Sequence, residues 1–292
     1  MIKEYLFPKS VNEAVEILKK YNGGARVISG GTDLVIDIEN ETVKTEVLVD
    51  VTRIEGCGDI KFCDGYLILG AGVTMTEASA NERIKSNVYS LAKAAGSVGS
   101  VQIRNTATLT GNVVRAQPAA DSAVMLAALD AVLTVCGPDG TKDIPVQDTY
   151  AGVGKSVIDP TKEVVSTIKF KEPLKNQGSG FVRLVQRKAL ALPMLNVGAV
   201  VSIGEGRIEW ARITMAPVGT KPIRAAEAEN FLVGKIPSDD VLKEAGKLAL
   251  KNAAPRTSLI RGSKEYRTGV LPSLVTKALK ESINEVRAKG GM

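Results

Sequence analysis

The sequence predicts an α+β fold built from three successive units. Three observations lead to this prediction: a helix and strands share the N-terminal part, a hairpin precedes helical patterns in the middle, and an antiparallel strand pair precedes helices near the C-terminus. The units are expected to span residues 1–56, 57–172 and 178–292. With 292 residues and 44% hydrophobic content, the chain can bury a substantial core.

The first unit opens with an amphipathic helix. Ser10 and Glu13 have the spacing of a capping box, in which each side chain accepts a hydrogen bond from the other residue's backbone. The apolar residues of this helix recur at helical spacing: Val11, Ala14, Val15 and Leu18. A strand then runs into Gly30 and Gly31, and residues 47–51 predict another strand.

The second unit opens with a hairpin, because residues 60–62 and 66–69 flank the turn signal Asp64-Gly65. The elements expected after it are helices near residues 76–85 and 91–98, a loop over 102–112, a helix over 121–129, and strands over 131–136 and 164–170.

The third unit follows a linker expected at residues 171–180, where proline, two glycines and mixed charge occur together. A strand over residues 181–186 and an antiparallel pair, 197–203 with 207–215, come next. Three helices are expected at the end, over residues 225–232, 239–252 and 271–289, with Ser238 and Ser273 as N-terminal signals of the last two.

The content of histidine and cysteine excludes several classes of function. The chain has no histidine, which removes Ser-His-Asp and Cys-His triads, the usual transition-metal ligand and histidyl attachment of a cofactor. Cys57, Cys63 and Cys136 are too few and too irregularly spaced for a disulfide framework or a zinc site. We therefore expect no metal ligands and no hydrolase triad.

Charge and hydropathy indicate neither nucleic acid nor membrane. The net charge of +6 is scattered along the chain and no recognition motif accompanies it, so a solvated surface or a patch facing an acidic partner is expected. No run approaches the roughly 18 apolar residues of a membrane span, and the first residues lack the apolar stretch of a signal peptide. A cytoplasmic protein is the expectation.

The segment Arg26-Val-Ile-Ser-Gly-Gly-Thr-Asp-Leu34 carries the strongest functional signal, because an apolar strand there meets a glycine pair. Glycine leaves room for an anion and admits positive φ, so successive N–H groups can converge on a phosphate. An ordinary tight turn also fits this segment alone. A second segment, residues 102–112, is rich in small and hydroxyl-bearing side chains, and Asp121 follows it. Together the two segments favour a nucleotide site.

These segments resemble the two flavin-binding loops of the FAD-binding subunit of the molybdenum hydroxylases, the xanthine dehydrogenase family. The family's first loop, Ala-Gly-Gly-Thr-Asp, is matched by Ser29-Gly30-Gly31-Thr32-Asp33. Its second, Ile-Arg-Asn followed by Thr-Ile-Gly-Gly-Asn, is matched by Ile103-Arg104-Asn105 and Thr108-Leu109-Thr110-Gly111-Asn112. Thr110 replaces a glycine. The resemblance spans nearly the whole chain, and Gly262-Ser-Lys-Glu-Tyr-Arg267 is most like the xanthine dehydrogenase branch.

The resemblance implies a two-part FAD-binding domain, residues 1–56 and 57–172, followed by a C-terminal α+β domain with a small antiparallel sheet and helices. It implies that FAD is bound noncovalently, with both loops around the pyrophosphate. The residues expected to contact the cofactor are Val27, Ile28, Ser29, Gly30, Gly31, Thr32, Asp33, Leu34, Val101, Thr108, Gly111, Asn112, Asp121, Ile168 and Lys188.

Two of these residues have particular expected roles. Asp121 is expected to accept a hydrogen bond from a ribityl or ribose hydroxyl, because a carboxylate and a phosphate repel each other; capping of the following helix is an equal alternative. A cation near the pyrimidine edge stabilises reduced flavin. Lys188 is expected to supply that cation, with Arg183 and Arg187 as alternatives.

The resemblance also implies partners and an acceptor. A molybdopterin-binding subunit would hydroxylate a heterocycle or aldehyde, and a 2Fe-2S subunit would relay the electrons to FAD. NAD+ would receive them, with ferredoxin or oxygen as alternative acceptors. This chain would supply no catalytic residue to the hydroxylation. The alternatives are a subunit serving another substrate, such as an aromatic heterocycle, an aldehyde or CO, a stand-alone FAD-dependent oxidase, and a nucleotide-binding scaffold without activity.

Overall fold

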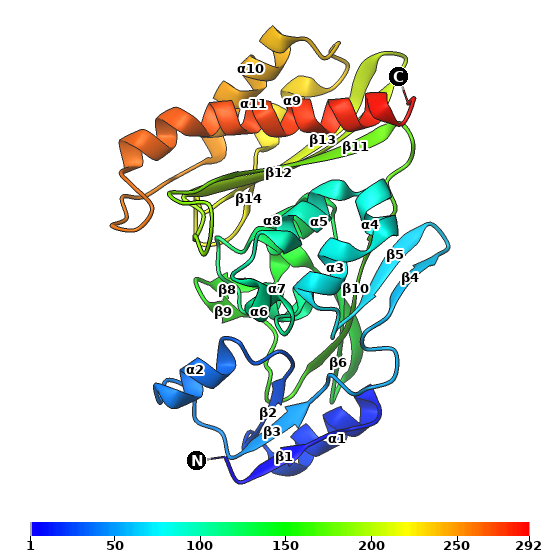
Figure 1. Cartoon of the computed structure of the whole chain (residues 1–292), viewed down its shortest axis with the longest axis vertical. Coiled ribbons are helices and arrows are strands. Elements are labelled where there is room, and N and C mark those ends of the chain that lie inside the picture. Colours follow the sequence, from blue (N-terminus) through cyan, green and yellow to red (C-terminus); the bar gives the residue numbers. More distant parts are fainter. Residues whose placement is uncertain (1, 292) are drawn as a thin grey trace.

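The structure, a computed structural model, describes residues 2–291 and confirms the α+β prediction (Figure 1). Its N-terminal sheet is parallel, with strands in the order β1-β3-β2, and helix α1 packs against it. The bounds are β1 Glu4–Leu6, α1 Val11–Tyr21, β2 Ala25–Ile28, α2 Leu34–Glu39 and β3 Val47–Asp50. Neither β1 nor α2 was expected, since elements of three and six residues are too short to show a period.

The start of α1 confirms half of the predicted capping box. The Ser10 hydroxyl accepts a hydrogen bond from the Glu13 N–H at 3.1 Å, as expected for an N-cap. The Glu13 carboxylate accepts from the N–H of Lys9 rather than from that of Ser10. The predicted apolar face is correct, since Ala14, Val15 and Leu18 are buried.

The middle of the chain forms a five-stranded antiparallel sheet in the order β4-β5-β10-β6-β7. The predicted hairpin is confirmed, with Cys63 paired to Tyr66 across the turn. The strands of this region are β4 Ile60–Cys63, β5 Tyr66–Gly70, β6 Val132–Gly137, β7 Gly140–Pro145, β8 Tyr150–Gly152, β9 Lys155–Ser156 and β10 Val164–Lys171. Between β7 and β8 lies the short 3-10 helix Val146–Asp148, and β8 and β9 form a separate two-stranded ladder.

Six short helices connect these strands, and two predictions made for this region are wrong. The single helix expected near residues 76–85 is broken at Asn81, whose side chain accepts from the Ile84 N–H at 3.0 Å and starts a new helix. The expected loop over residues 102–112 contains two helices, each capped by a hydroxyl side chain, Ser100 and Thr108. The helices are α3 Met75–Ala80, α4 Glu82–Asn87, α5 Tyr89–Gly96, α6 Val101–Arg104, α7 Leu109–Val114 and α8 Asp121–Ala128.

The C-terminal part is an antiparallel sheet in the order β11-β12-β13-β14, followed by helices. The bounds are β11 Gln177–Leu184, β12 Leu195–Gly204, β13 Arg207–Ala216, β14 Ile223–Arg224, α9 Ala226–Leu232, α10 Asp239–Leu248, the 3-10 helix Ala249–Asn252 and α11 Lys264–Ala288. Ser238 caps α10 as predicted. The prediction for Ser273 is wrong, because α11 starts after Ser263 and runs through Pro272. The connection to the middle part is also shorter than the predicted linker, since β11 begins at Gln177.

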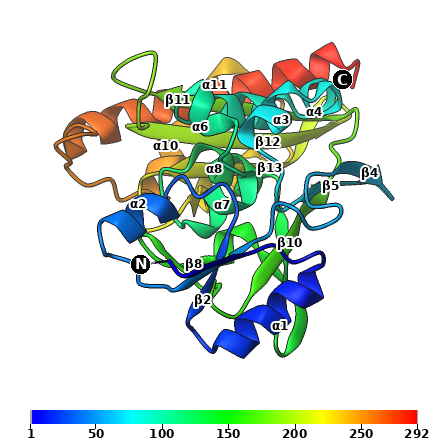
Figure 2. The same cartoon turned by 60° about the horizontal axis from the view of Figure 1, so that its bottom comes forward.

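The C-terminal sheet is covered on both faces (Figures 1 and 2). Helices α9 and α11 pack on one face, with α10 against them, and α5 and α8 of the middle part pack on the other. The close approach of α11 to β11 explains two glycines in this strand. A Cβ on Gly178 would lie 2.0 Å from the Ser282 carbonyl oxygen, and a Cβ on Gly180 would lie 2.2 Å from the Ala278 carbonyl oxygen. All eight residues of α8 are buried. In residues 2–291, no helix is long and apolar enough to cross a membrane.

Candidate functional site

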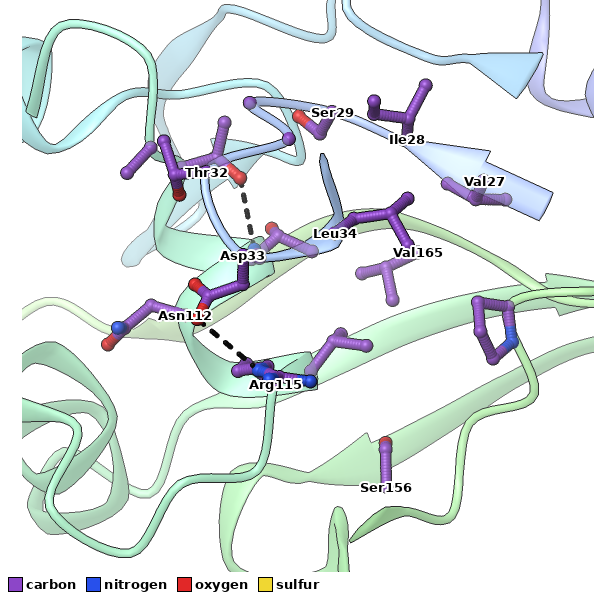
Figure 3. Close-up of a pocket in the computed structure, with 18 of the residues that line it drawn as sticks. Val27, Ile28, Ser29, Thr32, Asp33, Leu34, Asn112, Arg115, Ser156 and Val165 are labelled. Carbon is purple, nitrogen blue, oxygen red and sulfur yellow. Dashed lines mark hydrogen bonds and ion pairs between the residues drawn. The ribbon is translucent and has the colours of Figure 1, made fainter. Parts of the chain in front are cut away.

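A cavity of about 620 Å³ opens where the end of β2 meets α6, α7 and the β8–β9 ladder. The glycine-pair segment forms one wall and the start of α7 forms another, so the structure brings the two predicted loops together (Figure 3). Eleven of the residues expected to contact a cofactor line this cavity: Val27, Ile28, Ser29, Gly30, Gly31, Thr32, Asp33, Leu34, Thr108, Gly111 and Asn112.

The glycine pair has two different structural causes. A Cβ on Gly30 would lie 2.0 Å from the Thr106 carbonyl oxygen, so the two loops approach each other closely at this point. Gly31 has a φ of +67°, a region that side chains with a Cβ rarely adopt. The structural reason for Gly30 is therefore the contact between the loops, and Gly31 supplies the turn that leads into α2.

Two hydroxyl groups on the cavity wall have no hydrogen-bond partner among residues 2–291. Ser29 Oγ and Thr110 Oγ1 are both buried and unpaired. A buried polar atom without a partner costs free energy, which makes such atoms unusual in a folded protein. Thr110 stands where the family's second loop has a glycine, and its hydroxyl adds a donor to this wall. The cavity thus presents unsatisfied hydroxyls that suit a ligand rich in oxygen acceptors.

The other polar residues of the second loop are already engaged. The Thr108 hydroxyl caps α7 by accepting from the Gly111 N–H at 3.0 Å, and the Asn112 side-chain oxygen accepts from the Ser122 hydroxyl at 2.7 Å. These bonds fix the backbone of the segment from Thr108 to Asn112. They explain how a loop of small polar residues keeps a defined wall.

Charged groups also line the cavity. Arg115, at the end of α7, forms an ion pair with Asp37 at 2.7 Å. It also forms one with Asp33 at 3.4 Å (Figure 3). Arg26 is half-buried on β2, and burial lowers the pKa of its guanidinium. Sequence reasoning identified neither arginine as part of the site, because a lone arginine leaves no pattern until the fold shows what it faces.

Residues 1–171 match the family model described as "FAD binding domain in molybdopterin dehydrogenase". The chain belongs to this family of FAD-binding molybdenum hydroxylase subunits. Residues 181–282 match the "CO dehydrogenase flavoprotein C-terminal domain", so both parts agree with the predicted family. Such subunits belong to oxidoreductases, and the prediction of an oxidoreductase subunit is confirmed.

Among curated relatives, the nicotinate dehydrogenase FAD-subunit of Eubacterium barkeri is 30% identical over 236 residues, covering 79% of each chain. The xanthine dehydrogenase FAD-binding subunit of Escherichia coli O157:H7 is 26% identical, covering 96% of this chain and 94% of its own. Among solved structures, carbon monoxide dehydrogenase from Hydrogenophaga pseudoflava superposes with a TM-score of 0.90 at 24% identity, covering 98% of each chain. That likeness supports the fold.

Four residues expected to contact FAD do not line the cavity. Val101 is 59% exposed on α6, whereas Val98 and Ile103 beside it do face the cavity. Ile168 is fully buried in β10, between β5 and β6, and Val165 lines the cavity in its place. Asp121 and Lys188 lie elsewhere. Apolar residues at neighbouring positions of a helix or strand face different sides, which a single sequence does not resolve.

Asp121 belongs to a buried ion pair rather than to the cavity wall. Its carboxylate lies 3.0 Å from Arg183 Nε and accepts from the Asn196 side-chain amide at 2.7 Å. Burial raises the pKa of Asp121 to about 6, although the Arg183 charge and the Asn196 hydrogen bond act to lower it. The capping alternative is wrong, because Ala120 is the N-cap of α8 and Asp121 is the first helical residue.

The three cations proposed for the flavin ring differ in what they contact. Arg183 is engaged by Asp121 and also donates to the Ala191 carbonyl. Arg187 donates to the Leu190 carbonyl oxygen at 2.6 Å. Lys188 is exposed in the segment between β11 and β12. Among the described residues, Lys188 is therefore the one of the three cations that forms no hydrogen bond or ion pair, and its role at the ring stays a prediction.

Proposed function

We propose that this chain binds FAD noncovalently in the cavity and passes electrons from iron–sulfur clusters on a partner subunit to NAD+. The observation that carries this proposal is the joining of both glycine-containing loops around one cavity in a member of an FAD-binding family. The unpaired hydroxyls of Ser29 and Thr110 support it, since a pyrophosphate offers the acceptors that they lack.

The residues that would hold FAD divide by position. The segment from Val27 to Leu34 and the residues Thr108, Gly111 and Asn112 would contact the nucleotide and pyrophosphate. Lys188 would lie at the ring, where a positive charge favours the reduced form. Bound FAD supplies both one-electron and two-electron chemistry, which an iron–sulfur donor and a hydride acceptor require. The protein's part is to bind the cofactor, orient it and set the charge around it.

We further propose that the substrate is hydroxylated on a molybdopterin-binding partner. Among the described residues, no group of three or more histidine, cysteine, aspartate or glutamate side chains is placed to hold a metal ion. The relatives carry the names of nicotinate, xanthine and carbon monoxide dehydrogenases, so these three substrates are the first to test. Xanthine is our first choice, because the segment from Gly262 to Arg267 resembles that branch.

Purification of the native complex from cells tests both proposals. The expected result is a yellow complex that contains iron and molybdenum and reduces NAD+ with one of the three substrates. A chain that purifies without flavin would contradict the cofactor proposal, and a flavoprotein that purifies without iron or molybdenum would contradict the partners.

The isolated chain gives a second test. Reconstituted with FAD, it should oxidise NADH in the presence of an artificial electron acceptor, because hydride exchange needs only an accessible flavin. It should not hydroxylate xanthine, nicotinate or any aldehyde. If the chain does not oxidise NADH, this result would count only against NAD+ as the acceptor. Hydroxylation of a substrate by the metal-free chain would contradict the whole proposal. Cytoplasmic residence stays a prediction.

A further inference from the structure

Two carboxylates stand beside the glycine pair, where the proposed function places a pyrophosphate. Asp33 follows the pair after one intervening residue, Thr32, and Asp37 lies one helical turn later on α2. Both line the cavity. A pyrophosphate is itself a dianion, and like charges a few ångströms apart repel at a partly buried surface. The wall that should receive the anion therefore carries the negative charges of Asp33 and Asp37 besides the positive charge of Arg26 on β2.

Arg115 lies between these carboxylates. Its Nη1 is 2.7 Å from Asp37 Oδ2 and its Nη2 is 3.1 Å from Asp37 Oδ1, so the pair is bidentate. Its Nε is 3.4 Å from Asp33 Oδ1. The side chain of Asp37 is 19% exposed and that of Arg115 is 34% exposed, so water screens this cluster only in part.

The cluster crosses between the two walls of the cavity. Asp33 and Asp37 belong to the first wall, whereas Arg115 extends from the end of α7 in the second. Within residues 2–291, no other ion pair joins residues 1–56 to residues 57–172. Figure 3 shows Arg115 directed toward Asp33, with Asn112 alongside.

We propose that Arg115 is a positioning residue for FAD: it neutralises Asp33 and Asp37 so that the glycine-pair wall can receive the pyrophosphate. Arg115 acts here through the two carboxylates and not by contacting the phosphates. This inference rests on the proposed binding of FAD and adds a residue outside the two matched loops. It explains how an acidic pair can remain next to a binding site for a dianion.

Two other roles for Arg115 lead to different results. In the first role, Arg115 is a brace that holds the two walls together through its ion pairs. In the second role, Arg115 is a direct ligand that binds the phosphates with its own charge. Replacing Arg115 alone weakens FAD binding in all three cases. The cases separate when the Asp37 carboxylate is removed as well, because part of the repulsion then disappears while the link and the cation stay absent.

The experiment measures the dissociation constant of FAD for the flavin-free full chain by quenching of flavin fluorescence. The variants are Arg115→Gln and the double variant Asp37→Asn, Arg115→Gln, which keeps Asp33 because that residue belongs to the segment proposed to contact FAD. Arg224→Gln is the matched control, because Arg224 also joins two carboxylates, those of Asp130 and Glu229, away from the cavity. Each constant is measured at low and at high salt, and circular dichroism checks that every variant is folded.

Arg115→Gln should weaken FAD binding by about tenfold or more, the effect of leaving an extra negative charge beside a dianion. High salt should restore part of this loss by screening the repulsion. The double variant should bind FAD clearly more tightly than Arg115→Gln does, because only the Asp33 charge then stays unneutralised, and Arg224→Gln should bind FAD as the wild type does. A double variant that binds as weakly as Arg115→Gln would overturn the inference in favour of a brace or a direct ligand. A wild-type chain that binds no FAD would instead refute the proposed function.

Discussion

Replacing Asp121 by asparagine should change how the stability of the fold depends on pH. Burial raises the pKa of Asp121 from its ordinary 3.8 to about 6, so the folded state holds this proton more tightly than the unfolded state does. The stability contributed by the protonated group is therefore fully present below pH 4 and is lost as the pH rises through 6. A difference of about 2 in pKa corresponds to about 3 kcal/mol over this range. Asparagine cannot ionise there and keeps one acceptor for its neighbours.

The assay is urea unfolding between pH 4 and pH 7.5, followed by the fluorescence of Trp210, the single tryptophan, which packs against the core. The free energy of unfolding of Asp121→Asn should rise relative to that of the wild type by about 2–3 kcal/mol from the lowest to the highest pH, because only the wild type loses stability over this range. Asp139→Asn, on the exposed turn between β6 and β7, should follow the wild-type profile. Parallel profiles for wild type and Asp121→Asn would refute this reasoning.

Substitutions at four single positions give further predictions. Gly30→Ala should lower both the melting temperature and the FAD content after gel filtration, because the new Cβ would lie 2.0 Å from the Thr106 carbonyl oxygen. Gly31→Val should also lose FAD, because valine rarely adopts the φ of +67° found at this position. Normal flavin content in both variants would remove the first loop from the site. Lys188→Met should lower the flavin reduction potential in a redox titration, and an unchanged potential alongside a lower one for Arg187→Met would move the role to Arg187. Gly269→Ala should stabilise the chain by about 0.5–1 kcal/mol, since the site lies inside α11 and nothing stands within 4 Å of the new Cβ; a fall in the urea midpoint would contradict this.

The sequence was most informative where a single local rule decides the structure. The hairpin around Asp64-Gly65 and the Ser238 cap were predicted because the turn and the cap depend on neighbouring residues only. The helix break at Asn81 and the start of α11 at Ser263 were missed. In both places a capping residue competed with a continuous helical pattern, and the sequence alone did not show which would prevail.

The candidate site shows a similar division. Both loops were identified from their glycines and hydroxyls, and their meeting at one cavity agrees with the interpretation. Asp121, Arg115 and Arg183 could not be assigned in this way, because each acts through a partner far away in the sequence. A carboxylate near a binding loop can accept a hydrogen bond from a sugar hydroxyl or form an ion pair with an arginine, and the sequence is the same in both cases. Only the packing of α8 against β12 decides that Asp121 faces Arg183 and Asn196.

The burial of α8 has a consequence for how this subunit can be divided or recombined. The helix belongs by sequence to the FAD-binding domain, yet a Cβ on Gly198 of β12 would lie 3.2 Å from the Val124 carbonyl oxygen, so the C-terminal sheet supplies one side of its enclosure. A fragment ending at residue 171 would expose this apolar side to water and should be insoluble. A chimera that takes its C-terminal domain from a relative must therefore have a strand with small side chains opposite α8. Proteolytic cleavage within residues 172–176 should leave the two pieces associated.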